Sequence, residues 1–236
     1  MARMCLCLNQ VAYIRNRNKS ASPDPAAAAV AAELAGVDGI VVQVREDRLD
    51  ITERDVSVLK QVVHSHLNVA VALNDDMINK VLKWLPDMVT LLPNTNEQNN
   101  STSLDLVSNL EYIEEVATTL RANKIIVSAL IKPETQQVRA AARARIDYVQ
   151  LNTAPLANIE DMGSMNDMVE QVKSTAMAAN KLGLGVSVGR GLNEQSLREL
   201  GVVPFIEEFN VGRAIMGKAI MVGLEKVIRQ FKLLVV

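Results

Sequence analysis

Short apolar segments alternate with helix-forming segments along the whole chain, and this repeat limits the fold more than any other feature of the sequence. Eight strand–helix units follow one another in this way. The predicted strands are Met4–Asn9, Gly39–Val44, Asn68–Leu73, Asp87–Leu92, Ile125–Leu130, Asp147–Leu151, Gly185–Val188 and Pro204–Val211. They are apolar throughout rather than alternating, which is typical of a parallel sheet covered by helices on both faces.

The segments between these strands carry helix start and stop signals. Thr52 with Asp55 is a pair that caps a helix start, Asn74 is another N-cap residue, and Gly36 is typical of a helix end. A polar segment, 15–22, precedes the first predicted helix. Helices are predicted over Ala26–Ala35, from Thr52 to about His64, from Asn74 to Trp84, and over Leu104–Ala122, Pro133–Ala144, Ser164–Lys181 and Met216–Phe231.

Eight such units predict a (β/α)8 TIM barrel of the α/β class, and 236 residues suit a single barrel domain over residues 1–236. A doubly wound open sheet is the alternative. That fold would normally show a G-x-G-x-x-G turn after its first strand, where this sequence reads NQVAYIRN. The barrel is therefore the favoured architecture.

Composition excludes several classes of protein. A net charge of −2 argues against a nucleic-acid binder. The two cysteines, Cys5 and Cys7, are too few for a metal quartet, and they point the same way on one predicted strand. No apolar run approaches the roughly 20 residues that span a bilayer, and the N-terminal segment has too short an apolar core for a signal peptide. We expect a cytoplasmic protein with no metal, cofactor, membrane or nucleic-acid partner.

Two Gly-Arg turns close the last two predicted strands, Gly189-Arg190-Gly191 and Gly212-Arg213. Glycine lets a backbone approach a ligand closely, a helix N-terminus offers free N–H groups, and arginine presents a fork of donors that suits phosphate. The last two turns of an eight-fold barrel lie side by side and commonly hold a phosphate. These turns predict a phosphate site; in the plainer interpretation the glycines only end strands and the arginines are solvated.

Three strings make the chain resemble a known family: R-N-x(6)-PDP at Arg15–Pro25, AGVDGIVVQVREDRLDITERDV at Ala35–Val56 and EFNVGRAIMGKAI at Glu208–Ile220. They resemble pyridoxine 5′-phosphate synthase, which closes the ring in one vitamin B6 pathway. The resemblance implies a (β/α)8 barrel that assembles as an octamer. It also implies condensation of 3-amino-1-hydroxyacetone phosphate with 1-deoxyxylulose 5-phosphate, a transferase reaction without a cofactor.

The resemblance also identifies the site positions. The family's catalytic histidine, glutamate and second histidine fall at Gln43, Ala70 and Arg190. The family's ligand- and phosphate-binding positions are Cys7, Asn9, Gln10, Arg15, Arg45, Asp50, Asn100, Gly191, Gly212 and Arg213. Of these, only Arg15, Arg45, Gly191 and Gly212 match the family's residue types. The titrating residues are thus replaced, while the residues that hold anions remain.

Two functions of different class follow from this pattern. The first is an enzyme of vitamin B6 biosynthesis, or a relative acting on a related sugar phosphate, whose acid–base groups have been replaced. Candidate replacements are Asp50, Glu46, Asp47, Lys132 and Cys7, the cysteine as a nucleophile if Arg15 or Arg45 depresses its pKa. His64 and His66, the two histidines, lie at the N-terminal side of the third strand, away from the expected site.

The second function is that of a pseudoenzyme, which binds a phosphorylated metabolite or acts as a scaffold or regulatory subunit. We expect a homo-oligomer, or a mixed oligomer with an active subunit of the same family. The apolar end Phe231–Val236 is expected to pack against the base of the barrel or a neighbouring subunit. The loop Pro93–Ser103 is long enough to be an active-site segment.

Overall fold

The computed structural model describes residues 2–45, 50–94, 102–159 and 161–235. Eight parallel strands form a closed barrel in chain order, which confirms the predicted (β/α)8 architecture. The strands are β1 (Arg3–Cys7), β2 (Gly39–Gln43), β3 (Leu67–Ala72), β4 (Met88–Leu92), β5 (Ile126–Ile131), β6 (Tyr148–Asn152), β7 (Gly185–Gly189) and β8 (Glu208–Val211).

The barrel closes where β1 pairs with both β2 and β8. Cys5 is in register with Gly39 on one side and with Asn210 on the other. Each described strand therefore has two neighbours, and the barrel exposes no strand edge. The carboxyl ends of all the strands meet at one face, which we call the mouth.

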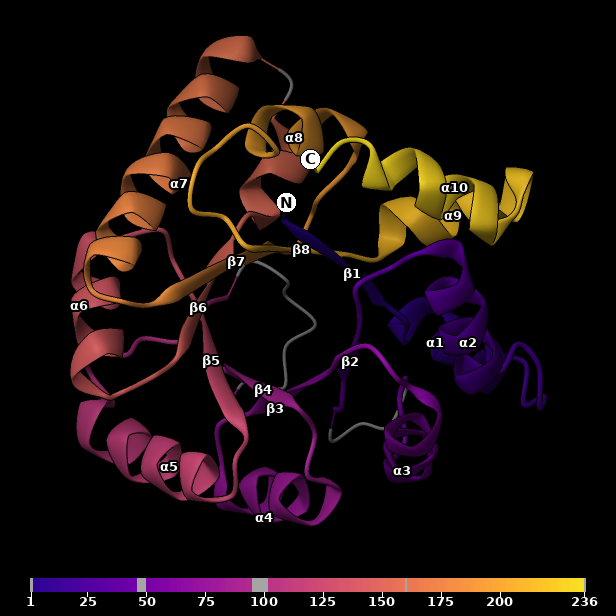
Figure 1. Cartoon of the computed structure of the whole chain (residues 1–236), viewed down its shortest axis with the longest axis horizontal. Coiled ribbons are helices and arrows are strands. Elements are labelled where there is room, and N and C mark those ends of the chain that lie inside the picture. The colour runs from indigo at the N-terminus through magenta and orange to yellow at the C-terminus, as the bar shows by residue number, and fades with distance from the viewer. Residues whose placement is uncertain (1, 46–49, 95–101, 160, 236) are drawn as a thin grey trace.

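Helices surround the barrel (Figure 1). They are α1 (Asn9–Arg17), α2 (Pro25–Ala35), α3 (Glu53–Val62), α4 (Asp75–Trp84), α5 (Leu110–Ala122), α6 (Thr135–Arg143), α7 (Met162–Lys181), α8 (Glu194–Leu200), α9 (Arg213–Val222) and α10 (Leu224–Lys232), with the short 3-10 helix η1 (Ala154–Asn158) after β6. The C-terminal pair, α9 and α10, lies beside α2, which brings the two ends of the chain together (Figure 1). Within the described residues, no helix combines the length and apolarity that crossing a bilayer requires.

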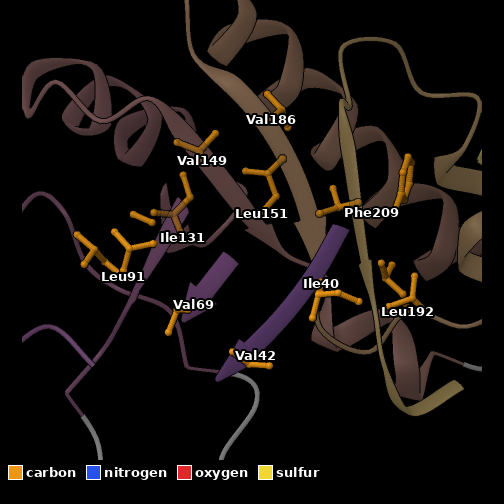
Figure 2. Packing of buried hydrophobic residues seen from close by; sticks show 14 of the residues in the cluster. Ile40, Val42, Val69, Leu91, Ile131, Val149, Leu151, Val186, Leu192 and Phe209 are labelled. Carbon is orange, nitrogen blue, oxygen red and sulfur yellow. The ribbon is translucent and has the colours of Figure 1, made fainter. Parts of the chain in front are cut away.

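The hydrophobic core lies between the barrel and its helices. Ile40, Val42, Val69 and Phe209 are among its buried side chains, each from a strand position that faces the helices (Figure 2). Positions on this face are two residues apart along a strand, as the pleat requires. Burial of this layer supplies the main hydrophobic stabilisation of the fold.

The inner face of the strands is different, because it carries polar side chains. Asn68, Thr90, Ser128, Gln150, Ser187, Glu208 and Asn210 are all buried. Each stands at the alternate strand position, and a small apolar group (Ala70, Leu92 and Leu130) is separate from the main core. The sequence suggested strands that are apolar throughout, and this prediction was wrong. One face is apolar and the other is mixed.

Local signals position several helices as predicted. The Thr52 side chain accepts from the Asp55 backbone, and Asp55 accepts from the Thr52 backbone, which is a capping box at the start of α3. Asn74 accepts from the Met77 backbone and caps α4. Gly36 ends α2 with a φ of 101°, in the left-handed region that glycine tolerates best.

Two helix predictions were wrong in extent, and one helix was not predicted. The sequence showed only a polar segment at 15–22, yet α1 begins directly after β1 and includes Arg15. Helix α5 begins at Leu110 rather than Leu104. The last predicted helix is in fact two, because Gly223, with a φ of 90°, separates α9 from α10. None of these boundaries has a strong side-chain cap to mark it in the sequence.

Candidate functional site

The predicted site residues gather at the mouth, on the ends of β1, β2, β7 and β8. Cys7 and Gln43 are the last residues of β1 and β2. Gln43 is in register with Ala70, so two of the three positions predicted to be catalytic in the family are neighbours. The chain connectivity brings them together with the turns after β7 and β8, because β8 pairs with β1.

Asn9 joins the ends of β1 and β2. Its Oδ1 accepts from the Gln43 backbone N–H at 2.8 Å, and its Nδ2 donates to the Gln43 carbonyl at 2.8 Å and to Asp50 Oδ2 at 3.2 Å. The Cys7 thiol also donates to Asn9 Oδ1 at 3.3 Å. The Asn9 amide thus makes the backbone hydrogen bonds to Gln43 that a neighbouring strand would otherwise make. Its contacts hold four predicted site residues in place relative to one another: Cys7, Asn9, Gln43 and Asp50.

Thr153 fixes the turn after β7. Its hydroxyl contacts the carbonyl oxygens of Gly189 at 3.0 Å and Arg190 at 2.7 Å. Arg190 and Gly191 both have a positive φ, 77° and 68°. Such a backbone disfavours an arginine, so buried hydrogen bonds are needed to hold it. The Arg190 side chain therefore extends from a constrained backbone rather than from a flexible loop.

Gly212 brings the turn after β8 against β1. A Cβ at this position would lie 3.0 Å from Cys7 Cβ and 3.1 Å from Gln10 Oε1, so a side chain has no room. Gly212 is also the N-cap residue of α9, and among the described residues no side chain caps that helix. Its first N–H groups and the positive end of its dipole therefore favour an anion at the mouth.

The electrostatics of the mouth are dominated by arginine. Burial lowers the pKa of Arg190, and the positive charges of Arg45 and Arg213 lower it further, while the Cys7 thiol acts in the opposite direction. Like charges brought together in a partly buried site repel one another. An anion bound among these groups would relieve that repulsion.

Cys7 does not have the depressed pKa that a nucleophile would need. Burial raises the pKa of its thiol, and Asp50 adds to the increase, outweighing the opposite effects of the Asn9 backbone and Arg190. The condition for a nucleophilic Cys7, a pKa depressed by Arg15 or Arg45, is therefore not met. The thiol donates a hydrogen bond to Asn9.

Arg15 forms a bidentate ion pair with Asp55. The Nη1–Oδ1 and Nη2–Oδ2 distances are 2.6 Å and 2.7 Å, and the side chains are 13% and 10% exposed. This pair connects α1 to the capping box of α3. The sequence identified Asp55 as a helix cap and Arg15 as a ligand-binding residue. It did not indicate that the two side chains form an ion pair.

The remaining candidates are dispersed. His64 and His66 lie just before β3, at the opposite end of the barrel from the mouth, as predicted. Lys132 follows β5 and is exposed. Asn100, Glu46 and Asp47 lie outside the described residues. No cluster of three or more metal-ligating His, Cys, Asp or Glu side chains occurs among the residues that are described.

Two further polar side chains lie at the mouth, and one of them, Asn210, was missed. Asn152 ends β6 and donates to Ser103 Oγ at 3.0 Å, which holds the chain after β4 against the mouth. Asn210 lies on β8, in register with Gly189. The signal was present in the sequence, since both are polar residues at alternate positions of otherwise apolar strands.

Comparison with known proteins gives concordant matches. The family model described as "Pyridoxal phosphate biosynthesis protein PdxJ" matches residues 4–236. A pyridoxine 5′-phosphate synthase from Syntrophobacter fumaroxidans is 38% identical over 236 residues, covering 100% of this chain and 99% of the relative. One from Geotalea uraniireducens is 37% identical over 230 residues, covering 97% and 96%.

Solved structures match the fold at low identity. KGPDC from Streptococcus mutans has a TM-score of 0.64 and 14% identity, covering 100% of this chain and 97% of its own. Thiamine phosphate pyrophosphorylase from Pyrococcus furiosus has a TM-score of 0.62 and 16% identity, with coverage of 99% and 95%. At these identities the likeness shows the barrel fold alone.

Proposed function

Because the chain belongs to the PdxJ family and is a pyridoxine 5′-phosphate synthase-like barrel of vitamin B6 biosynthesis, we propose that it keeps the family's phosphate binding while its acid–base turnover is impaired or lost. One observation carries the proposal. At the mouth, arginines are grouped around an uncapped helix start, while the three family catalytic positions hold Gln43, Ala70 and Arg190.

The binding half of the proposal rests on Arg190, Arg45, Arg213 and the start of α9. Their charges act on one another, and the α9 amides add donors from the same side. Charge-assisted hydrogen bonds to phosphate are about twice as strong as neutral ones. The ligand class that suits this arrangement is a phosphorylated small molecule.

The loss of turnover follows from the side chains that replaced the family's titrating groups. Gln43 can hydrogen-bond but cannot exchange protons, Ala70 can do neither, and Arg190 keeps its proton. Each lost acid–base group typically costs about 10²–10⁴-fold in rate. Three such losses in one site leave little of the family reaction.

Asp50 supports a second candidate, a relative with altered chemistry on a related sugar phosphate. Its carboxylate accepts from Asn9 and lies close enough to Cys7 to affect the pKa of the thiol. A carboxylate in this place can act as a base. In this alternative Asp50 takes over one proton transfer, and the protein is an enzyme rather than a binding barrel.

Assembly belongs to the same proposal. Leu34, Ile220 and Met221 are large apolar residues with exposed fractions of 81%, 75% and 81%. Such residues favour burial against another subunit. A homo-oligomer, or a mixed oligomer with an active family member, accounts for them, and a cytoplasmic location suits a member of this biosynthetic family.

A paired assay tests this function. The purified protein is given 3-amino-1-hydroxyacetone phosphate and 1-deoxyxylulose 5-phosphate, and released phosphate is measured beside the relative from Syntrophobacter fumaroxidans. A thermal melt with inorganic phosphate is recorded for the wild type and Arg45→Ala. We expect no release above background, and a rise in melting temperature that Arg45→Ala reduces.

Other outcomes separate the alternatives. Turnover that disappears in both Arg45→Ala and Asp50→Asn supports the enzyme with altered acid–base groups. Turnover similar to that of the relative contradicts the proposed loss. If phosphate leaves the melting temperature unchanged even at high concentration, the proposed anion site is wrong.

A further inference from the structure

We infer that Asn210 is a specificity-determining residue of the mouth, and that its amide hydrogen-bonds an oxygen substituent on the carbon chain of the phosphorylated ligand. This inference rests on the proposed phosphate binding. The arginines would contact the phosphate, and the inference assigns recognition of the ligand's carbon chain to Asn210. This residue is not among the site positions predicted from the sequence.

The first observation is that the buried Asn210 amide is unsatisfied. Its side chain is only 8% exposed, and among the residues that the structure describes neither Nδ2 nor Oδ1 has a hydrogen-bond partner. Burying an amide without replacing its hydrogen bonds to water is unfavourable. Such a group in a native protein calls for an explanation, and a ligand is one of the few available.

Other buried amides inside the barrel differ from it. Asn68 Oδ1 accepts from Thr90 Oγ1 at 3.0 Å. Asn152 donates to Ser103 and accepts from the Ala154 backbone. The strands can therefore satisfy an interior amide when it is structural. Asn210 is not satisfied in this way by the described part of the chain.

The second observation is the position of Asn210 on its strand. It faces the barrel interior, since Phe209 beside it belongs to the core that faces the helices (Figure 2). Its partners in register are Gly189 on β7 and Cys5 on β1, and the next residue on its own face is Gly212. A Cβ at Gly189 would lie 3.1 Å from Asn210 Cβ and 2.2 Å from Gln150 Nε2. Gly189 and Gly212 contribute no side chain between this amide and the two Gly-Arg turns, while the Gln150 side chain lies against Gly189.

A second unsatisfied group lies near the same opening. Gln10 Oε1 is buried without a hydrogen-bond partner among the described residues, and it lies 3.1 Å from where a Gly212 Cβ would be. The α9 start and Arg213 are adjacent to Gly212 along the chain. A phosphate held at that turn would therefore lie close to Gln10 Oε1 and two residues beyond Asn210 on the same strand face.

The chemistry of an amide decides what it can recognise. Asn210 offers two N–H donors and one carbonyl acceptor. A hydroxyl or ketone oxygen complements it, and an unsubstituted alkyl chain does not. A site whose buried polar groups would otherwise remain unpaired discriminates strongly against the analogue that lacks the oxygen.

Two phosphate esters of equal chain length test the inference. Glycerol 3-phosphate and n-propyl phosphate differ only in hydroxyl groups, and inorganic phosphate reports on the anion site alone. Calorimetric titration of the wild type should show glycerol 3-phosphate binding about five- to tenfold more tightly than n-propyl phosphate. Asn210→Leu should remove this preference and leave the affinity for inorganic phosphate unchanged.

Matched variants separate recognition from structure. Asn68→Leu removes a buried amide elsewhere in the barrel and should keep the preference. Asn210→Leu should melt no lower than the wild type, because its amide has no partner to lose among the described residues. Asn210→Ser provides a smaller substitution if the leucine is not accommodated, and it should also reduce the preference.

The opposing results are distinct. Equal wild-type affinity for the two esters, or an equal loss of affinity for all three probes in Asn210→Leu and Asn210→Ser, overturns the inference without contradicting phosphate binding by the wild type. Failure of the wild type to bind inorganic phosphate overturns the proposed function instead, and this inference with it.

Discussion

Arg190 shows how one residue can change the character of a mouth. The sequence predicts a family histidine at its position, and it stands on a left-handed backbone that Thr153 holds, where burial among like charges lowers its pKa. A histidine there could exchange protons near neutral pH, whereas an arginine remains charged. On the proposed function, the arginine gives anion binding in place of proton transfer at that position.

Replacing Arg190 tests this directly. Arg190→Gln should weaken inorganic phosphate binding about ten- to a hundredfold, the range expected for one charge-assisted hydrogen bond. A thermal melt checks that the variant remains folded. Titration calorimetry measures the affinity, with Arg198→Gln on α8 as the control; an equal effect of the control would contradict the assignment.

The ion pair of Arg15 with Asp55 predicts a dependence on pH. Burial alone would raise the pKa of Asp55, but the hydrogen bonds from Arg15 and Thr52 lower it below its ordinary value. A carboxyl whose folded pKa is lowered stabilises the protein above its unfolded pKa of about 3.9, and that contribution is lost as the pH falls through the folded pKa.

Asp55→Asn should therefore lower the free energy of unfolding by about 3 kcal/mol at pH 7, as expected when one partner of a buried pair is removed. The difference from the wild type should shrink below about pH 4. Urea unfolding at pH 7 and pH 3 measures it, with the exposed Asp76→Asn as the control. A difference that stays constant with pH would show that the pair is not responsible.

At the scale of elements, glycines decide where the C-terminal helices begin and end. Gly217 lies inside α9 and Gly223 lies between α9 and α10, and a Cβ at either position would meet nothing within 4 Å. Only their backbones differ, since Gly223 alone has a positive φ, of 90°. Alanine substitutions at Gly217 and Gly223 therefore test the conformational preference of the backbone separately from side-chain packing.

Gly217→Ala should raise the free energy of unfolding by up to about 1 kcal/mol, because alanine favours a helix interior. Gly223→Ala should lower it by about 1–2 kcal/mol, because an L-residue disfavours a positive φ. Calorimetric melts of the two variants test the opposite signs. A stabilising Gly223→Ala would mean that α9 and α10 can join into one continuous helix.

At the scale of the whole molecule, the C-terminal segment closes the fold from outside. Phe231 and Val235 are buried, as expected for the apolar end, but Leu233 is exposed. Lys232 donates to the Gly36 carbonyl and to Asp38 at the start of β2. The end of the chain is thus attached to its first βα unit, and α9 and α10 still present apolar side chains outward.

These side chains carry the prediction about assembly. Ile220→Glu with Met221→Glu should reduce the mass measured by light scattering, because charges cannot be buried in an apolar interface without a partner. The matched change Leu182→Glu, at another exposed apolar residue, should leave the mass unchanged. A wild type that is monomeric at every concentration would contradict the predicted oligomer.

The sequence by itself determined the barrel, the two Gly-Arg turns, the helix caps and the family, because these depend on local periodicity, on φ preferences and on short strings. Only the tertiary structure decided that Arg15 pairs with Asp55, that the Cys7 pKa is raised and that the Asn210 amide is left unsatisfied by the described residues. These properties depend on which side chains meet across strands far apart in the chain, and on how much water their packing excludes. Neither quantity is encoded in spacing along the sequence.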